Sequence, residues 1–148
     1  MARILVLLIT LMLSGRMMTL AFIHRAGAGG DGDPPLAWLM PLIGDAVIGI
    51  GGLLIAYLLA RHTGLWVWTA AMIWNALGIW DAMSAYIVHL TTPWPTFFMI
   101  QVFGGAMFFM AAAMHAFLIV LLLREPVKRH YLGIAPRTAT APSATDAA

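Results

Sequence analysis

The chain has 148 residues, of which 62% are hydrophobic and 9% are charged. Soluble domains carry about 25% charged residues, so this composition excludes an ordinary soluble protein and indicates an integral membrane protein. The formal net charge is +2, but the lysines and arginines are scattered, so the sequence predicts no nucleic-acid surface. The absence of cysteine excludes disulfides, thiolate zinc sites and cysteine-ligated iron–sulfur clusters.

The first apolar run covers residues 4–23 and is interrupted only by the short stretch 14–16. A signal peptide is the rival interpretation, because Arg3 and the apolar residues after it resemble a charged n-region followed by an h-region. Apolar residues resume after residue 16, however, and the small-residue cleavage candidate at 26–28 lies far from the h-region. We therefore expect a retained transmembrane helix.

Three further apolar runs follow, and glycine, proline and polar residues separate them. A run of about 20 apolar residues crosses a hydrocarbon core of about 30 Å, so each is long enough to span a membrane. The sequence predicts an all-α integral membrane bundle of four transmembrane helices in one domain, residues 1–134, followed by a disordered cytoplasmic tail, residues 135–148. The predicted spans are residues 4–23, 36–60, 65–90 and 97–123.

Positive charges near the span ends predict the orientation. The loop of residues 24–35 has only Arg25, which Asp31 and Asp33 offset, and the loop of residues 91–96 is uncharged. Cytoplasmic loops carry the excess of lysine and arginine, so both termini should be cytoplasmic. The positive charges on that side are Arg3, Arg61, Arg124, Lys128 and Arg129.

Three of the predicted spans carry a charged residue in their interior. Counted at about 1.5 Å per residue, Arg16 lies roughly 10 Å, and Asp45 and Asp81 lie roughly 13 Å, from the outer ends of their spans. A charge in hydrocarbon is costly unless it is paired, protonated or wetted. We therefore expect these three side chains to meet in one layer, with Asn75 close by as an interhelical hydrogen-bonding group.

This polar seam of Arg16, Asp45, Asn75 and Asp81 has two interpretations. Buried ion pairs often fix helix register without any chemistry, which favours a structural role. Two carboxylates against one guanidinium nevertheless leave surplus negative charge, unless one aspartate holds a proton. Such a surplus acid is what a proton-linked transporter or permeation unit would use.

Small residues recur at helical spacing on the same faces, which predicts close helix packing. The predicted inward faces are Asp45, Gly49, Gly52 and Ala56 on the second span, Ala71, Asn75, Gly78, Ala82 and Ala85 on the third, and Gln101, Gly104, Gly105, Ala112 and His115 on the fourth.

His115 is a candidate haem ligand, because membrane b-type haems are held by histidines. It lies roughly 12 Å from the inner end of its predicted span. The only partner on that side is His62, which lies in a turn, so no haem, other cofactor or metal is predicted and haem stays an alternative. No catalytic arrangement is apparent, so we expect no enzyme activity.

The segment of residues 74–81, WNALGIWD, resembles a pattern in small bacterial inner-membrane proteins of unknown function. Those proteins have about four spans, with the tryptophan–asparagine, glycine and aspartate on the third. The resemblance covers the middle half of the chain, including Gly44 and Asp45, and implies a multi-pass protein of the bacterial inner membrane. It implies no activity, cofactor or catalytic residue.

The leading hypothesis is a non-enzymatic structural or accessory subunit in contact with the lipid bilayer. Its further partners would be other membrane subunits or a second copy of the chain. A proton-linked transporter and a haem-binding redox protein are the alternatives.

Overall fold

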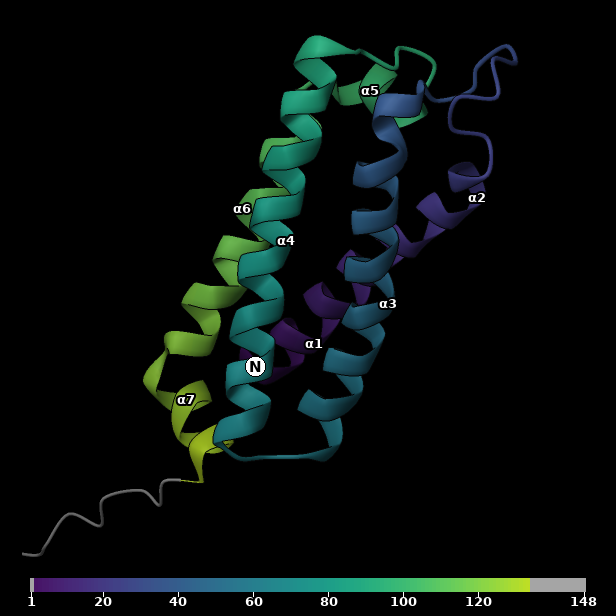
Figure 1. Ribbon diagram of the computed structural model, residues 1–148. Helices are drawn as coiled ribbons and strands as arrows, with labels where there is room; N and C mark the ends of the chain where they lie inside the picture. Colours follow the sequence, from purple (N-terminus) through teal and green to yellow (C-terminus); the bar gives the residue numbers. More distant parts are fainter. Residues whose placement is uncertain (1, 134–148) are drawn as a thin grey trace, which may run out of the picture.

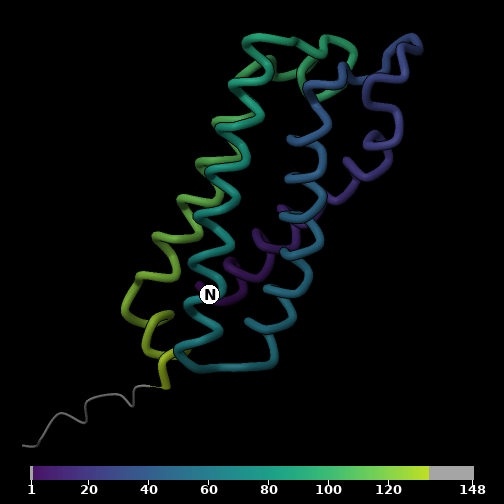
Figure 2. Tube along the Cα trace, viewed as in Figure 1, coloured from purple at the N-terminus to yellow at the C-terminus, as the bar shows by residue number. Residues whose placement is uncertain are grey.

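The computed structural model describes residues 2–133, and these are organised as helices joined by loops. Three long helices run alongside one another: α3 (Leu39–Arg61), α4 (Leu65–Thr91) and α6 (Ala106–Leu123) (Figure 1). The N-terminal segment crosses them obliquely, as the Cα trace shows in purple (Figure 2). It consists of α1 (Ala2–Leu13), the 3-10 helix η1 (Ser14–Thr19) and α2 (Leu20–Ile23).

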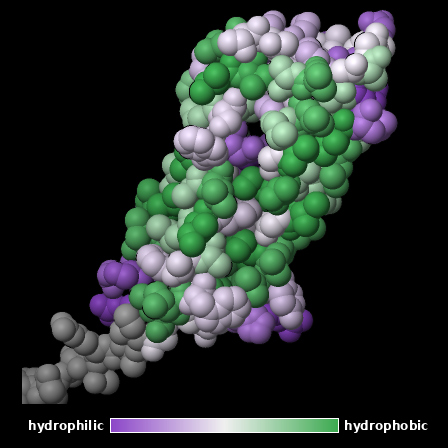
Figure 3. All heavy atoms as spheres, viewed as in Figure 1, coloured by the Kyte–Doolittle hydropathy of each residue, from purple (hydrophilic) through white to green (hydrophobic). Residues whose placement is uncertain are grey.

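Within residues 2–133, three segments are long and apolar enough to cross a membrane, namely Ala2–Ile23, Leu36–Arg61 and Ala106–Leu123. On the visible face, hydrophobic residues cover the sides of the molecule and hydrophilic residues gather at its two ends (Figure 3). These features indicate a multi-pass membrane protein whose apolar helices contact lipid. The predicted helical class is therefore confirmed, and these three segments, which coincide with the first, the second and part of the fourth predicted span, have the length and apolarity that a span needs.

Helix α4 has 27 residues but is not among the three apolar segments. Its tryptophans and its interior Asn75 and Asp81 make it less apolar than its neighbours. It packs against both α3 and α6. The length and packing of α4 are therefore those of a fourth span, although its composition alone does not identify it as one.

The predicted fourth span, residues 97–123, is wrong as a single helix. A short helix, α5 (Phe98–Phe103), ends where Gly104 adopts a φ of +56°, a conformation that glycine adopts readily and other residues rarely do. Helix α6 begins only at Ala106. As a result Gln101 is exposed, and its predicted place on the inward face is also wrong.

The first predicted span is helical throughout but tightens into η1 at its centre. The Ser14 hydroxyl donates to the Thr10 carbonyl at 2.9 Å, and the Thr19 hydroxyl donates to the Arg16 carbonyl at 2.8 Å. Such side-chain bonds compete with regular helical hydrogen bonds. Arg16 lies within this 3-10 segment.

The small-residue faces predicted for the second and third spans are confirmed. Gly49 lies against the backbone of Arg16 and Met17, and a Cβ there would overlap those backbone atoms. A Cβ at Gly52 would overlap the Ser14 hydroxyl and the Trp74 ring. The buried small and polar residues are Gly49, Gly52 and Ala56 on α3, and Ala71, Asn75, Gly78, Ala82 and Ala85 on α4.

Two short helices flank the long ones, and the second was not predicted. The 3-10 helix η2 (Leu36–Trp38) leads into α3, and α7 (Glu125–Leu132) follows α6. Tyr131 of α7 is fully buried, and its hydroxyl donates to the Leu59 carbonyl at 3.2 Å. Helix α7 thus closes one end of the bundle, while the predicted tail, residues 135–148, lies outside the described residues.

Candidate functional site

Arg16 lies at the centre of a charged cluster between the helices. Its Nε donates to Asp45 Oδ1 of α3 at 2.6 Å, and its Nη2 donates to Asp81 Oδ2 of α4 at 2.5 Å. Nη2 also forms an ion pair with Asp45. The side chains are 14%, 23% and 13% exposed for Arg16, Asp45 and Asp81, so solvent screens these charges little. The contacts expected from the sequence are present.

The cluster extends through His115 of α6. Arg16 Nη1 lies 3.3 Å from His115 Nε2, and His115 Nδ1 lies 3.0 Å from Asn75 Oδ1. A guanidinium only donates, so Nε2 must accept, and the ring is the neutral tautomer with its proton on Nδ1. Asn75 Nδ2 in turn donates to the Ala71 carbonyl at 2.8 Å. Arg16 therefore contacts side chains from α3, α4 and α6.

The sequence does not predict that His115 joins the seam, because its depth is counted there from the inner end of a predicted span of residues 97–123, whereas the depths of the aspartates are counted from the outer ends of theirs. Helix α6 begins at Ala106, and His115 lies nine residues after it. Asp81 lies ten residues before Thr91, the end of α4. The two side chains therefore occupy nearly the same layer. The signal that could have revealed this is the Gly104-Gly105 pair, which ends α5.

Two glycines make room for the cluster. The Asp81 carboxylate lies over Gly44 of α3, and the His115 ring lies over Gly78 of α4. A Cβ at either glycine would overlap the side chain above it. The Trp74 ring packs edge-on against His115, with ring centroids 5.0 Å apart. The polar groups are thus held in position by close backbone approach and by aromatic packing.

The charges within the cluster do not balance. Asp45 and Asp81 both face Arg16, and His115 is neutral in the arrangement above. The remaining ion pairs of residues 2–133 lie elsewhere, in the loop after α2 and in α7. Those pairs bring no second cation to the aspartates.

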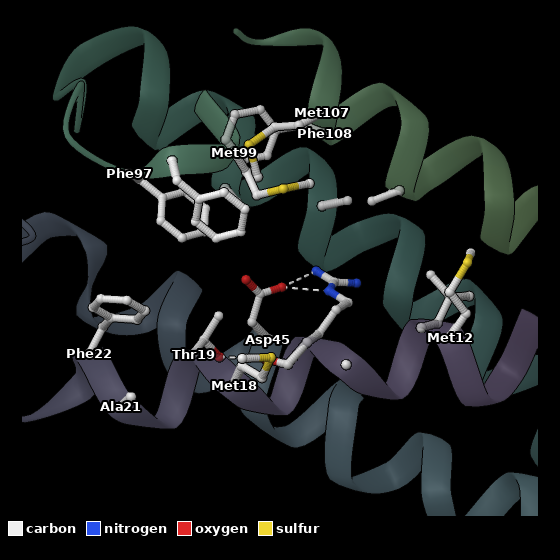
Figure 4. Close-up of a pocket in the computed structure, with 17 residues that line it drawn as sticks. Met12, Met18, Thr19, Ala21, Phe22, Asp45, Phe97, Met99, Met107 and Phe108 are labelled. Atoms are coloured by element: carbon white, nitrogen blue, oxygen red, sulfur yellow. Dashed lines mark hydrogen bonds and ion pairs between the residues drawn. The ribbon is translucent and has the colours of Figure 1, made fainter. Parts of the chain in front are cut away.

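A cavity of about 450 Å³ adjoins the charged cluster. Arg16 and Asp45 line it, and the Asp45 carboxylate points toward its interior (Figure 4). Its walls come from the N-terminal segment, from residues 97–111 and, at Ala82 and Ala85, from α4, and they are apolar apart from the charged pair and Thr19. The sequence alone does not predict this cavity.

No group of three or more histidine, cysteine, aspartate or glutamate residues within residues 2–133 could hold a metal ion. Both ring nitrogens of His115 have partners, so a haem iron would have to displace Arg16 or Asn75. His62 lies between Tyr57 and Trp66, with ring centroids 5.9 Å from each. The described contacts do not join His62 to His115.

No family model, no curated protein and no solved structure matches the chain. The resemblance of residues 74–81 and of Gly44-Asp45 to small bacterial inner-membrane proteins therefore stays a prediction. The three apolar helices support the coarser statement that the chain is a multi-pass membrane protein.

Replacing Arg16 with methionine should destabilise the protein by about 3–5 kcal/mol, because two buried carboxylates lose their cation. The triple variant Arg16→Met, Asp45→Asn, Asp81→Asn should recover much of that loss, since no uncompensated charge remains. Equilibrium unfolding in detergent micelles measures both effects.

Arg25→Met is the matched control, because Arg25 pairs with Asp33 at 2.6 Å but is 44% exposed. That variant should change the free energy of unfolding by less than about 1 kcal/mol. Equal losses of unfolding free energy for Arg16→Met and Arg25→Met would show that the inner cluster stabilises the fold no more than the Arg25–Asp33 pair does.

Proposed function

We propose that this chain is a non-enzymatic membrane protein, a small structural or accessory subunit whose charged cluster fixes the packing of its helices. The observation that carries this proposal is the set of partners around Arg16, which come from three other helices. A side chain that contacts all of these helices penalises a shift of any one of them. The proposal also accounts for the glycines that bring the backbones together at the same level.

The apolar packing beyond the cluster supports the structural role over a conducting one. The polar chain that begins at Asp45 and Asp81 ends at the Ala71 carbonyl. Toward the end of the bundle closed by α7, most buried residues are apolar and include Val67, Leu118 and Leu122. The buried hydroxyls of Thr10 and Ser14 donate to carbonyls of their own helix. The described residues thus offer no continuous polar route through that half.

We further infer that α4 is a fourth span and that both termini face the cytoplasm of a bacterial inner membrane. The turn with Arg61 and the basic helix α7 lie at one end of the bundle, as Figure 1 shows. Arg3 also lies near α7, where burial and the neighbouring Arg3 lower the pKa of His130. An excess of positive residues at one end is typical of the cytoplasmic side.

A proton-linked transporter is the second candidate, and one observation favours it. The cluster holds two carboxylates for one guanidinium, and one of them, Asp45, faces a cavity. A haem-binding redox protein remains a third hypothesis, although both ring nitrogens of His115 are already engaged.

The cysteine-free chain allows a direct test of orientation with single cysteines. Ala28→Cys and Pro95→Cys should react with a membrane-impermeant maleimide in spheroplasts, whereas Thr63→Cys and Glu125→Cys should react only after permeabilisation. All four positions are exposed. Labelling of positions 63 and 95 from the same side would show that α4 does not cross the membrane.

The accessory role predicts a stable partner. Mild solubilisation of native membranes, followed by affinity purification of the tagged full chain, should recover a reproducible second protein or a homo-oligomer. Arg25→Met, which alters only an exposed pair, should leave that complex intact. Recovery of the chain as a lone monomer would count against the accessory role.

Asp81→Asn separates the structural role from the proton-linked one. The structural role predicts that liposomes containing either wild-type or Asp81→Asn protein show no proton flux above empty liposomes, measured with an internal pH-sensitive dye. It also predicts lower thermal stability for the variant, because Arg16 loses one charged partner. Wild-type flux that disappears in a folded Asp81→Asn variant would establish the proton-linked alternative.

A further inference from the structure

The cavity beside Arg16 and Asp45 is not explained by a packing role. The cavity opens between the N-terminal segment and residues 97–111, where Met12, Met18 and Phe98 are exposed, so it is accessible from the surface of the bundle. At about 450 Å³ the cavity falls within the range of small-molecule sites. It also has a charged pair at one point and apolar walls elsewhere, which is typical of a ligand site.

Eight of the 17 residues that line the cavity are methionine or phenylalanine. Methionines are flexible and polarisable, so they adapt to ligands of different shape. Aromatic rings attract cations that lie within about 6 Å of their faces. The lining methionines and phenylalanines are Met12, Met18, Phe22, Phe97, Phe98, Met99, Met107 and Phe108.

These side chains surround the charged pair from both walls. Phe22 of the N-terminal segment and Phe97 before α5 meet edge to face, with ring centroids 6.0 Å apart. Figure 4 shows Phe97, Met99 and Phe108 on one side of the Asp45 carboxylate, and Met18 and Phe22 on the other. A bound molecule would therefore contact aromatic and thioether groups while its polar part faces Asp45.

The charges of Arg16, Asp45 and Asp81 determine which polar group of a ligand the cavity can accept. Arg16 is occupied by Asp45, Asp81 and His115, so its guanidinium is not free to receive an anion. The two aspartates carry one more negative charge than Arg16 balances when both are ionised. A positively charged group next to Asp45 would supply that missing charge, whereas an anionic group would face a surplus carboxylate.

We propose that this cavity binds a lipophilic organic cation, such as an ammonium or phosphonium with apolar substituents. Its charge lies beside the Asp45 carboxylate, and its substituents lie among the methionines and phenylalanines. This site is additional to the packing role and does not depend on the accessory assignment.

Two ions of matched size and opposite charge test the proposal. Tetraphenylphosphonium should bind the detergent-purified full chain saturably, after subtraction of its partition into empty micelles, whereas tetraphenylborate should not. Isothermal titration calorimetry measures both. Equal binding of the two ions, or no saturable binding of tetraphenylphosphonium, would overturn the proposal.

Two variants locate the site. Asp45→Asn should weaken tetraphenylphosphonium binding by about tenfold or more, because the ligand loses its charge partner. Ala111→Phe should abolish binding by filling the cavity without any change in charge, since Ala111 lines it. Ala113→Phe on the exposed face of the same helix is the control and should bind as the wild type does. Unchanged affinity in a folded Asp45→Asn or Ala111→Phe variant would exclude this cavity as the site.

Discussion

The arrangement of the helices depends on the ion pairs between Arg16 and the two aspartates. In a membrane-embedded bundle, each of these charges would be costly if it stood alone. Together they satisfy one another, provided that η1, α3 and α4 approach within side-chain reach at the same level. Gly44, Gly49 and Gly78 permit that approach because a side chain at any of them would overlap the neighbouring segment.

The bundle consists of two unlike halves on either side of the cluster. On one side, α7 and the apolar core around Leu118 and Tyr131 close the structure. On the other side, the N-terminal segment diverges from α5 and α6, and the cavity lies between them. The same charged group therefore contacts the closed half and also lines the cavity of the other half.

The neutral form of His115 follows from its position between two fixed partners. Arg16 requires an acceptor at Nε2, and the remaining proton on Nδ1 then suits the Asn75 carbonyl oxygen. This chain of contacts converts an isolated polar residue on α6 into a third link between helices. The Nε2 edge of the ring lies over Gly78, where no Cβ obstructs it.

The sequence by itself determined the membrane class, the inward faces of α3 and α4, and the layer shared by Arg16, Asp45 and Asp81. These features depend on composition, helical period and distance along one helix, which are local properties. Only the tertiary structure decided that His115 joins the cluster, that α7 closes one end and that a cavity adjoins Asp45. Those outcomes depend on the helix break at Gly104 and on contacts between distant segments, which no local pattern specifies.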